Sequence, residues 1–151
     1  MSYINLIYHI VFRTKYSTWA INVENEKLLY QYIWGYIKQR NCKLYQINGM
    51  PDHIHLLVGL HSTISIADFI QQLKNATHLF MERNKAYFPD FYAWAKGYCA
   101  LTYAEKDKDM ISRYIKNQKQ HHQFQSFEDE MKFLLKDSGI TIDNNFFDRN
   151  I

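Results

Sequence analysis

The sequence has few of the residues that mark disordered, disulfide-linked or membrane-spanning proteins. It has only 5 Gly and 2 Pro in 151 residues, and 47% of its residues are hydrophobic, which excludes a disordered or fibrous chain. The two cysteines, Cys42 and Cys99, lie far apart and outside any metal or redox motif, so we expect reduced, buried thiols. No apolar run approaches the roughly 18 residues of a membrane span. The N-terminus lacks the features of a signal peptide, so a cytoplasmic protein is expected.

The sequence also has little excess of positive over negative charge. The chain has 18 Lys and Arg against 15 Asp and Glu, a formal net charge of +3. This mild excess allows a nucleic-acid partner but does not require one. Aromatic residues are abundant instead, with 12 Tyr, 10 Phe and 3 Trp. We expect most of these rings to fill the core, while exposed ones could stack on unpaired bases.

Local patterns predict an alternation of strands and helices. Strands are expected at 3–13, 42–47, 53–60 and 92–103, and helices at 22–40, 65–84, 107–122 and 126–136. Ser65 and Ser126 are expected N-caps, and the turn signals at 48–52 predict a hairpin. The order β-α-β-β-α-β followed by two helices indicates an α+β, ferredoxin-like split βαβ fold, with an antiparallel sheet and helices on one face. We expect one domain over 1–151, with a core of about 3–137 and a tail at 138–151.

A histidine pair opens the third predicted strand, in the segment Pro51-Asp52-His53-Ile54-His55. Residues two apart on a strand share a face, so His53 and His55 can converge on one divalent ion while Ile54 points into the core. A half-exposed pair without a metal is the alternative, and the spacing alone leaves it open.

A tyrosine and a glutamine one turn apart mark the third predicted helix. Tyr114 and Gln118 are at i and i+4, so their side chains are expected on the same face. Taken alone, Tyr114 could be an ordinary core tyrosine. We expect the following pair, His121 and His122, at the surface or a helix end, and a structural hydrogen bond for His9, near the histidine pair.

Together, the Pro-Asp-His-Ile-His strand and the Tyr114-Ile-Lys-Asn-Gln118 helix resemble the single-tyrosine HUH transposases of small bacterial insertion sequences. These are TnpA-like proteins, and their relatives include the REP-associated tyrosine transposases. The segments at 8–16 and 97–98 also resemble this family, and the likeness spans roughly residues 3–137. The resemblance identifies the third helix as a catalytic helix that, with a further helix, follows the sheet.

The resemblance implies cleavage and rejoining of single-stranded DNA at hairpin-bearing element ends. Tyr114 would be the nucleophile and form a 5′-phosphotyrosine, while His53, His55 and Gln118 would hold Mg²⁺ or Mn²⁺. Family relatives work as homodimers that share active sites between subunits, so a homodimer is expected. Candidate phosphate contacts are Arg13, Lys15, Lys74 and Lys116. A non-catalytic nucleic-acid-binding module, or a domesticated relative that processes repeat hairpins, remains an alternative.

Overall fold

The computed structural model describes residues 1–143. Within this range the strands β1 (Ile7–Arg13), β2 (Lys43–Met50), β3 (His53–Gly59) and β4 (Cys99–Thr102) form one antiparallel sheet in the order β2-β3-β1-β4. The helices are α1 (Glu26–Gln39), α2 (Ile66–Arg83), α3 (Lys108–Lys116), α4 (Gln118–His121) and α5 (Phe127–Asp137), with short 3-10 turns η1 (Lys15–Ser17) and η2 (Glu105–Asp107). This is the predicted α+β split βαβ fold.

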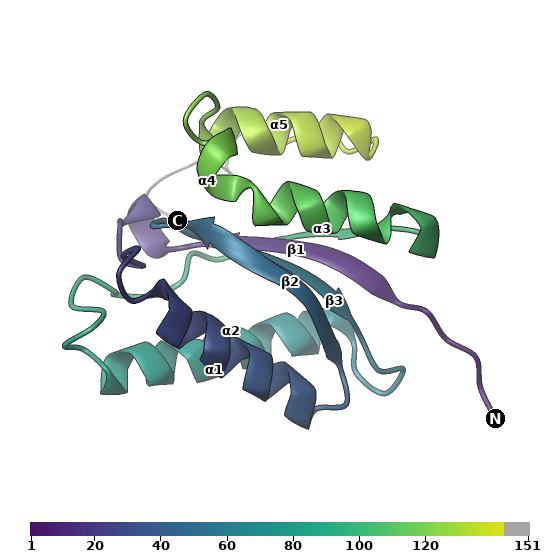
Figure 1. The fold of residues 1–151 in the computed structure, drawn as a ribbon, viewed down its shortest axis with the longest axis horizontal. Coiled ribbons are helices and arrows are strands. Elements are labelled where there is room, and N and C mark those ends of the chain that lie inside the picture. The colour runs from purple at the N-terminus through teal and green to yellow at the C-terminus, as the bar shows by residue number, and fades with distance from the viewer. Residues whose placement is uncertain (144–151) are drawn as a thin grey trace.

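Helices α1 and α2 cover one face of the sheet, as Figure 1 shows. Side chains alternate along the strands, and this face receives Ile10 and Phe12 from β1 and Ile54 and Leu56 from β3. These four residues are buried in the largest apolar cluster of the protein. This cluster packs the even-numbered side chains of β1 and β3 against α1 and α2, and the odd-numbered side chains lie on the opposite face of the sheet.

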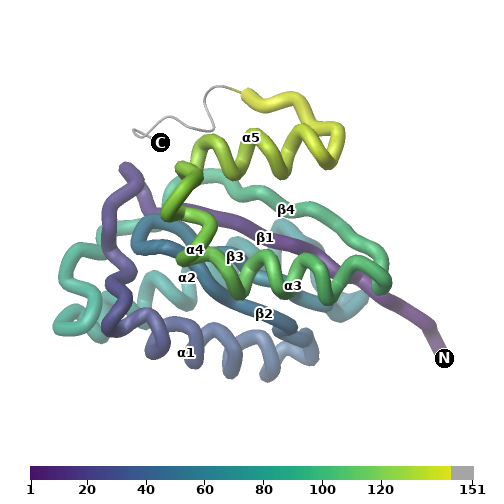
Figure 2. Tube along the Cα trace, turned by 45° about the horizontal axis from the view of Figure 1, so that its top comes forward, coloured from purple at the N-terminus to yellow at the C-terminus, as the bar shows by residue number. Residues whose placement is uncertain are grey.

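Helices α3 and α5 cover the opposite face (Figures 1 and 2). Ile115 of α3 packs against Leu57 of β3, and Met131 of α5 packs against Val11 of β1. The two helices thus close over the odd-numbered side chains of the central strands. Histidines at odd positions on β1 and β3 are therefore enclosed between the sheet and these helices.

The hairpin between β2 and β3 is tighter than the sequence predicts. Asn48 and Gly49 belong to β2, and the turn consists of Pro51 and Asp52. A Cβ added to Gly49 would lie 2.2 Å from the carbonyl oxygen of His53, so this strand pair approaches closely where there is no side chain.

The predicted helix at 107–122 is broken, because Asn117 separates α3 from α4. Its φ and ψ are −96° and 21°, outside the helical region. The side-chain amide of Asn48 on β2 donates to the carbonyl oxygen of Lys116 at 2.9 Å. This carbonyl therefore accepts a hydrogen bond from a group outside the helix. A contact from a distant strand therefore accounts for the break.

Three other elements are shorter than predicted. The strand expected at 92–103 is reduced to β4, since Gly97 adopts a left-handed φ of 83° just before it. The first strand begins at Ile7 rather than near residue 3, and α1 begins at Glu26 rather than residue 22. Asn22 caps a turn ahead of α1, where its side-chain oxygen accepts from the amide of Asn25 at 2.9 Å.

Helix α5 ends at a left-handed glycine. Gly139 has a φ of 74°, and the amide of Ile140 donates to the carbonyl of Leu135 at 2.8 Å. Ile142 then packs against the α5 cluster, so the first part of the expected tail lies against the protein. The rest of that tail, 144–151, lies outside the described residues.

Other composition-based expectations can be compared with the fold. Cys42 and Cys99 are both buried and free, as expected. No helix among residues 1–143 is long and apolar enough to cross a membrane. The expectation that most aromatic rings fill the core is less accurate for tyrosine, because five tyrosines are exposed: Tyr3, Tyr16, Tyr87, Tyr92 and Tyr98.

Candidate active site

The histidine pair of β3 lies on the face of the sheet that α3 and α5 cover. His53 and His55 point to this face, and Ile54 packs into the core below, as the spacing predicts. Both imidazoles are buried, at 1% and 0% exposure, which excludes the half-exposed alternative. Their ring centroids are 5.2 Å apart. Buried imidazoles require partners for their ring nitrogens.

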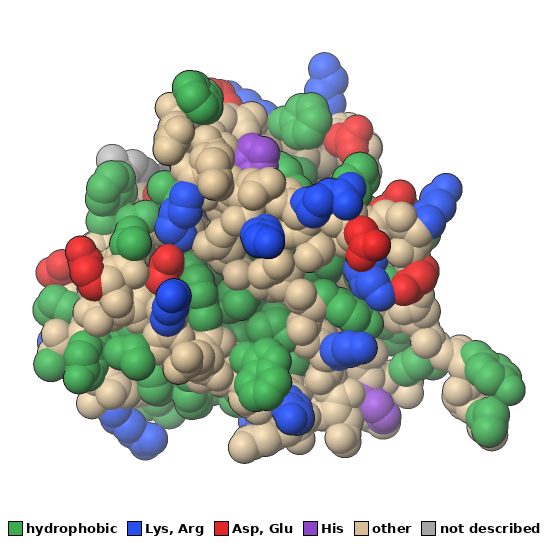
Figure 3. Space-filling model, viewed as in Figure 1, with side chains coloured by type: hydrophobic (Ala, Val, Ile, Leu, Met, Phe, Trp, Pro, Cys, Tyr) green, Lys and Arg blue, Asp and Glu red, His purple; other side chains and the backbone are tan. Residues whose placement is uncertain are grey.

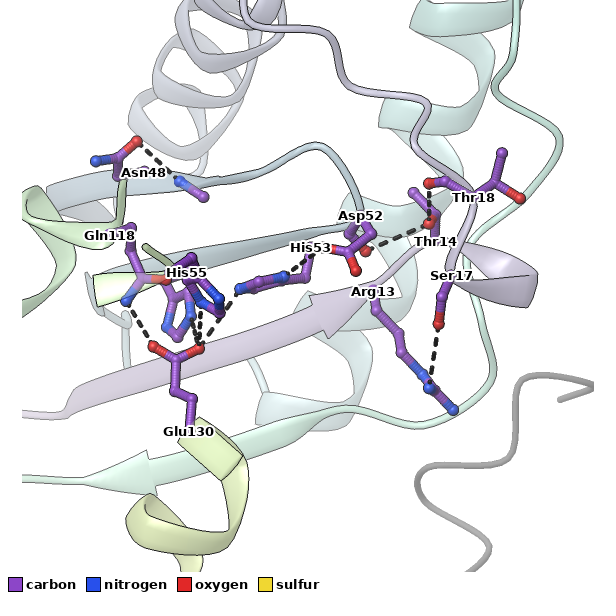
Figure 4. Close-up of polar contacts among 12 residues, drawn as sticks. Arg13, Thr14, Ser17, Thr18, Asn48, Asp52, His53, His55, Gln118 and Glu130 are labelled. Atoms are coloured by element: carbon purple, nitrogen blue, oxygen red, sulfur yellow. Dashed lines mark hydrogen bonds and ion pairs between the residues drawn. The ribbon is translucent and has the colours of Figure 1, made fainter. Parts of the chain in front are cut away.

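A carboxylate from α5 stands beside both imidazoles. Glu130 is fully buried, and its Oε1 lies 3.1 Å from His55 Nε2 and 3.5 Å from His53 Nε2 (Figure 4). Helix α5 is fixed at its start by Ser126, whose hydroxyl accepts from the amide of Asp129 at 3.1 Å. Glu130 follows directly, so the cap sets where this carboxylate enters the site.

The second oxygen of Glu130 holds the two helix residues that the sequence singled out. The Tyr114 hydroxyl donates to Glu130 Oε2, and Gln118 Nε2 donates to the same oxygen at 2.8 Å. The Tyr114 ring also meets the His55 ring edge-on, with centroids 6.1 Å apart. The structure therefore gathers Tyr114, Gln118 and the histidine pair around one carboxylate within a single chain, despite the break between α3 and α4.

The far nitrogen of each histidine has its own partner. His53 Nδ1 lies 2.7 Å from Asp52 Oδ1, and His55 Nδ1 lies 2.8 Å from Nε2 of the fully buried His9. This confirms the structural hydrogen bond expected for His9. Such partners fix ring orientation and tautomer. Both Nε2 atoms consequently face Glu130.

Burial controls the protonation of these histidines. It lowers the pKa of His55 to about 4 and that of His9 well below its usual value. Burial also acts to lower the pKa of His53, but the adjacent Asp52 and Glu130 outweigh it and leave that pKa raised. His55 and His9 are thus neutral near pH 7.

The pKa of Tyr114 is raised, whereas the pKa of Glu130 is lowered. Burial, and then the charge of Glu130, raise the pKa of the Tyr114 phenol. Burial acts to raise the pKa of Glu130, but the adjacent imidazoles of His122, His53 and His55 hold it well below its usual range. The site therefore contains an ionised carboxylate beside a protonated phenol.

The donor set around Glu130 fits a divalent cation. Ligand atoms of His53, His55 and Glu130 all lie within 4.8 Å of one another. His53 Nε2 and Gln118 Oε1 are buried without a hydrogen-bond partner. When His53 donates its Nδ1 proton to Asp52, its Nε2 lone pair faces a carboxylate oxygen, and a positive charge between them removes the repulsion. Imidazole, amide and carboxylate donors are compatible with Mn²⁺ or Mg²⁺ but do not select one ion.

The basic residues considered for phosphate contacts have unequal surroundings. Lys74 Nζ donates to the carbonyl oxygens of Ala95 at 3.0 Å and Gly97 at 2.7 Å, and burial lowers its pKa to about 8. Lys74 braces the segment before β4. A DNA contact from this residue stays a prediction.

Arg13, Lys15 and Lys116 differ in exposure. Arg13 is nearly buried beside the histidine site, while Lys116 is exposed on α3. Lys15 Nζ lies 5.4 Å from the ring centroid of Tyr16 and 5.9 Å from that of Tyr92, and these two rings stack 6.2 Å apart. On the face drawn in Figure 3, Lys and Arg side chains are interspersed with acidic and apolar ones and form no single dense patch.

Sequence reasoning missed Glu130. His122 lies at a helix end, as one of the two expected positions had it, because it is the C-cap of α4. Its side chain is only 7% exposed and its Nε2 lies 3.1 Å from Glu130 Oε1, so it reaches the site. His121 lies over Tyr114, with centroids 4.7 Å apart. One signal was available: Glu130 lies four residues before Leu134, on the apolar face of a helix, where an acid is unusual.

The fold and the site together define a small α+β protein whose antiparallel sheet carries a buried histidine pair opposite a helical tyrosine. The family model Y1_Tnp, described as Transposase IS200 like, matches residues 2–118. The chain belongs to this family of IS200-like transposases, which are DNA-processing enzymes. The matched region contains the histidine pair, Tyr114 and Gln118, and it ends before α5 and Glu130.

Individual relatives agree with this assignment. The chain is 28% identical over 120 residues to the ISDra2 transposase TnpA of Deinococcus radiodurans, covering 75% of this chain and 84% of that protein. It is 27% identical over 118 residues to the IS200 transposase of Salmonella typhimurium, and the match covers 76% of this chain and 77% of that protein. A crystal structure of a candidate transposase from Deinococcus radiodurans shares the fold with a TM-score of 0.62 at 30% identity, covering 78% of this chain and 93% of that one.

A REP-associated tyrosine transposase bound to a REP hairpin shares the fold with a TM-score of 0.57 at 12% identity, and the match covers 78% of this chain and 68% of that one.

Proposed function

We propose that this transposase cleaves and rejoins single-stranded DNA with Tyr114 as nucleophile and a divalent cation held by His53, His55 and Gln118. The observation that carries the proposal is the convergence of the Tyr114 hydroxyl and both imidazole Nε2 atoms on one buried carboxylate. An ordinary core tyrosine does not require a buried histidine pair opposite its hydroxyl.

The chemistry follows from the side chains. The Tyr114 oxygen attacks the scissile phosphorus, the bond from phosphorus to the 3′ oxygen breaks, and the 5′ phosphate remains on tyrosine. The phenol loses one proton and the departing 3′ oxygen gains one, so the products are a 3′-OH and a 5′-phosphotyrosine. Attack by a 3′-OH on this linkage reverses the step and rejoins strands without ATP. When bound, Mg²⁺ or Mn²⁺ neutralises charge on the phosphate.

The substrate proposed is single-stranded DNA that carries hairpins. One structural neighbour was solved with a REP hairpin, and its fold matches this chain. Exposed rings support a single-stranded substrate, since a base stacked on an aromatic ring contributes about 1–3 kcal/mol. Tyr16 and Tyr92, with Lys15 against both, provide such a platform near the start of η1. The modest net charge is consistent with binding of a short single-stranded segment at one site rather than with binding along a DNA duplex.

The arrangement also bears on oligomeric state. Tyr114 contacts His55 and Glu130 of its own chain, which supports a site assembled within one chain. The sharing of sites between subunits that the family resemblance implies stays a prediction. The homodimer expected from the family stays a prediction, which the mass in solution would test.

A covalent adduct is the direct test. The full chain is incubated with Mg²⁺ and single-stranded DNA from a hairpin-bearing element end, and a protein–DNA band that survives denaturation is expected. Tyr114→Phe should abolish the band. Tyr103→Phe is the matched control, because this half-buried tyrosine also lies near His9, with ring centroids 6.4 Å apart. An adduct formed at the wild-type rate by Tyr114→Phe would show that the nucleophile has been misassigned.

The non-catalytic binding alternative makes a different prediction. Binding of single-stranded DNA without any adduct, unchanged by a chelator and by His53→Ala, would favour a binding module. Processing of chromosomal repeat hairpins by a domesticated relative would give the same adduct, and the presence or absence of flanking element ends beside the gene distinguishes it.

A further inference from the structure

We infer that Glu130 of α5 is a fourth ligand of the divalent cation and makes α5 part of the active site. The inference rests on the cation site proposed above and extends it to a residue outside the matched family region. Its basis is the position of a buried carboxylate whose two oxygens face the two halves of the site.

The surroundings of Glu130 do not fit an ordinary ion pair. The residue is fully buried, and its ion pairs are with the histidines His53, His55 and His122. An ionised carboxylate removed from water needs a compensating charge. The side chains that contact this carboxylate carry imidazole, phenol and amide groups, and a divalent cation bound among them would supply a full positive charge beside it.

The separations fit a ligand beside the cation. At the roughly 2.1 Å bond lengths of an octahedral Mg²⁺ shell, neighbouring ligand atoms are about 3 Å apart and opposite ones about 4.2 Å. Glu130 Oε1 lies 3.1 Å from His55 Nε2 and 3.5 Å from His53 Nε2. These atoms are already spaced as neighbouring ligands, so the cation requires only small shifts of side chains.

The second oxygen adds a positioning role. Glu130 Oε2 accepts from the Tyr114 hydroxyl and from Gln118 Nε2, so one side chain links the nucleophile, a predicted ligand and the histidine pair. Met131 and Leu134 anchor the same helix on the β1–β4 side of the sheet. We therefore expect cation binding to stabilise the packing of α5 against the sheet.

Mn²⁺ affinity tests the inference directly. Titration calorimetry with Mn²⁺ alone is carried out on the full chain as wild type, Glu130→Gln and Glu128→Gln. Glu128 is the matched control, since it lies exposed on the same helix and pairs with Lys132 at 3.0 Å. We expect Glu130→Gln to weaken Mn²⁺ binding at least about tenfold and the control to stay within about twofold. Unchanged or tighter binding by Glu130→Gln would overturn the inference and show that the carboxylate obstructs the cation.

A second measurement uses the unmodified protein, in case Glu130→Gln folds poorly. Amide hydrogen exchange over 127–137 should slow when Mn²⁺ is added, because a bound cation ties α5 to β3. Unchanged or faster exchange would contradict a ligand role. Wild-type protein that binds no Mn²⁺ would overturn the cation site and this inference together. If wild type binds Mn²⁺, His53→Ala loses it and Glu130→Gln keeps it, only the role of Glu130 fails.

Discussion

The contact between Tyr114 and Glu130 predicts a stability change that can be measured without DNA or metal. Tyr114→Phe removes one donor from a fully buried carboxylate. A hydrogen bond to a charged group contributes about 1.5–3 kcal/mol. Glu130 Oε2 still accepts from Gln118 Nε2 at 2.8 Å, so we place the loss near the middle of that range, at about 2 kcal/mol. In a domain of this size that loss lowers the Tm by about 4–8 °C.

Thermal and urea unfolding in EDTA provide the assay, with Tyr98→Phe as a control at an exposed position. The control should stay within about 0.5 kcal/mol of wild type. A double-mutant cycle with Glu130→Gln should give a coupling free energy of about 1 kcal/mol or more, because the two side chains touch. Wild-type stability of Tyr114→Phe, or a coupling near zero, would refute the cis arrangement. Tyr114 would then lie elsewhere in solution, as in a site completed by a second subunit.

Three further outcomes follow from the structure. His9→Phe keeps a ring but removes the hydrogen-bond partner of His55, one of the proposed metal ligands, so Mn²⁺ affinity should fall about 10–100-fold by calorimetry. Unchanged affinity would count against this role of His9. Gly49→Ala places a Cβ 2.2 Å from a β3 carbonyl oxygen and should cost about 1–3 kcal/mol in urea unfolding, whereas Gly35→Ala, which meets nothing within 4 Å, should be neutral or stabilising. Equal effects of the two glycine substitutions would contradict the close approach. Burial, and then Glu26, raise the pKa of Tyr30 well above 10. Above pH 10 the folded chain therefore keeps a proton that the unfolded chain loses. The contribution of this group to the free energy of unfolding is complete below pH 10 and declines as the pH rises further. Tyr30→Phe should flatten that decline in urea unfolding between pH 9 and 11, and an equally steep decline would argue against it.

Features set by short-range patterns were predictable from the sequence. The alternation of His53, Ile54 and His55 places the two imidazoles on one face, because the side-chain period of a strand is two. The caps at Ser65 and Ser126 depend on a residue three positions on, and both accept the expected backbone hydrogen bond. Element order follows from such local signals, and the split βαβ topology follows from element order.

Features set by contacts between distant segments were not predictable in the same way. The break at Asn117 involves a side chain of β2 that donates to a helix carbonyl, and nothing in the helix sequence announces this. Asn48 and Gly49 are typical turn residues and predict the hairpin turn itself, although the pair lies in a strand that approaches β3 closely. No prediction was made for Glu130, because its partners lie on β3, α3 and α4, far from it in the sequence.

The residues that break local rules are the ones that gather at the site. The buried polar residues among 1–143 include five that converge here: His9, His53, His55, Gln118 and Glu130. Each occupies an interior position where an apolar side chain would pack without a desolvation cost. Local sequence reasoning fails most often where function, rather than stability, selects the residue. Glu130 is the strongest such case, since it replaces an apolar residue on the buried face of α5 and leaves the cluster with a negative charge. The proposed divalent cation would balance that charge and leave a positive excess for the phosphate, whereas a neutral side chain at position 130 would create no such need for a cation.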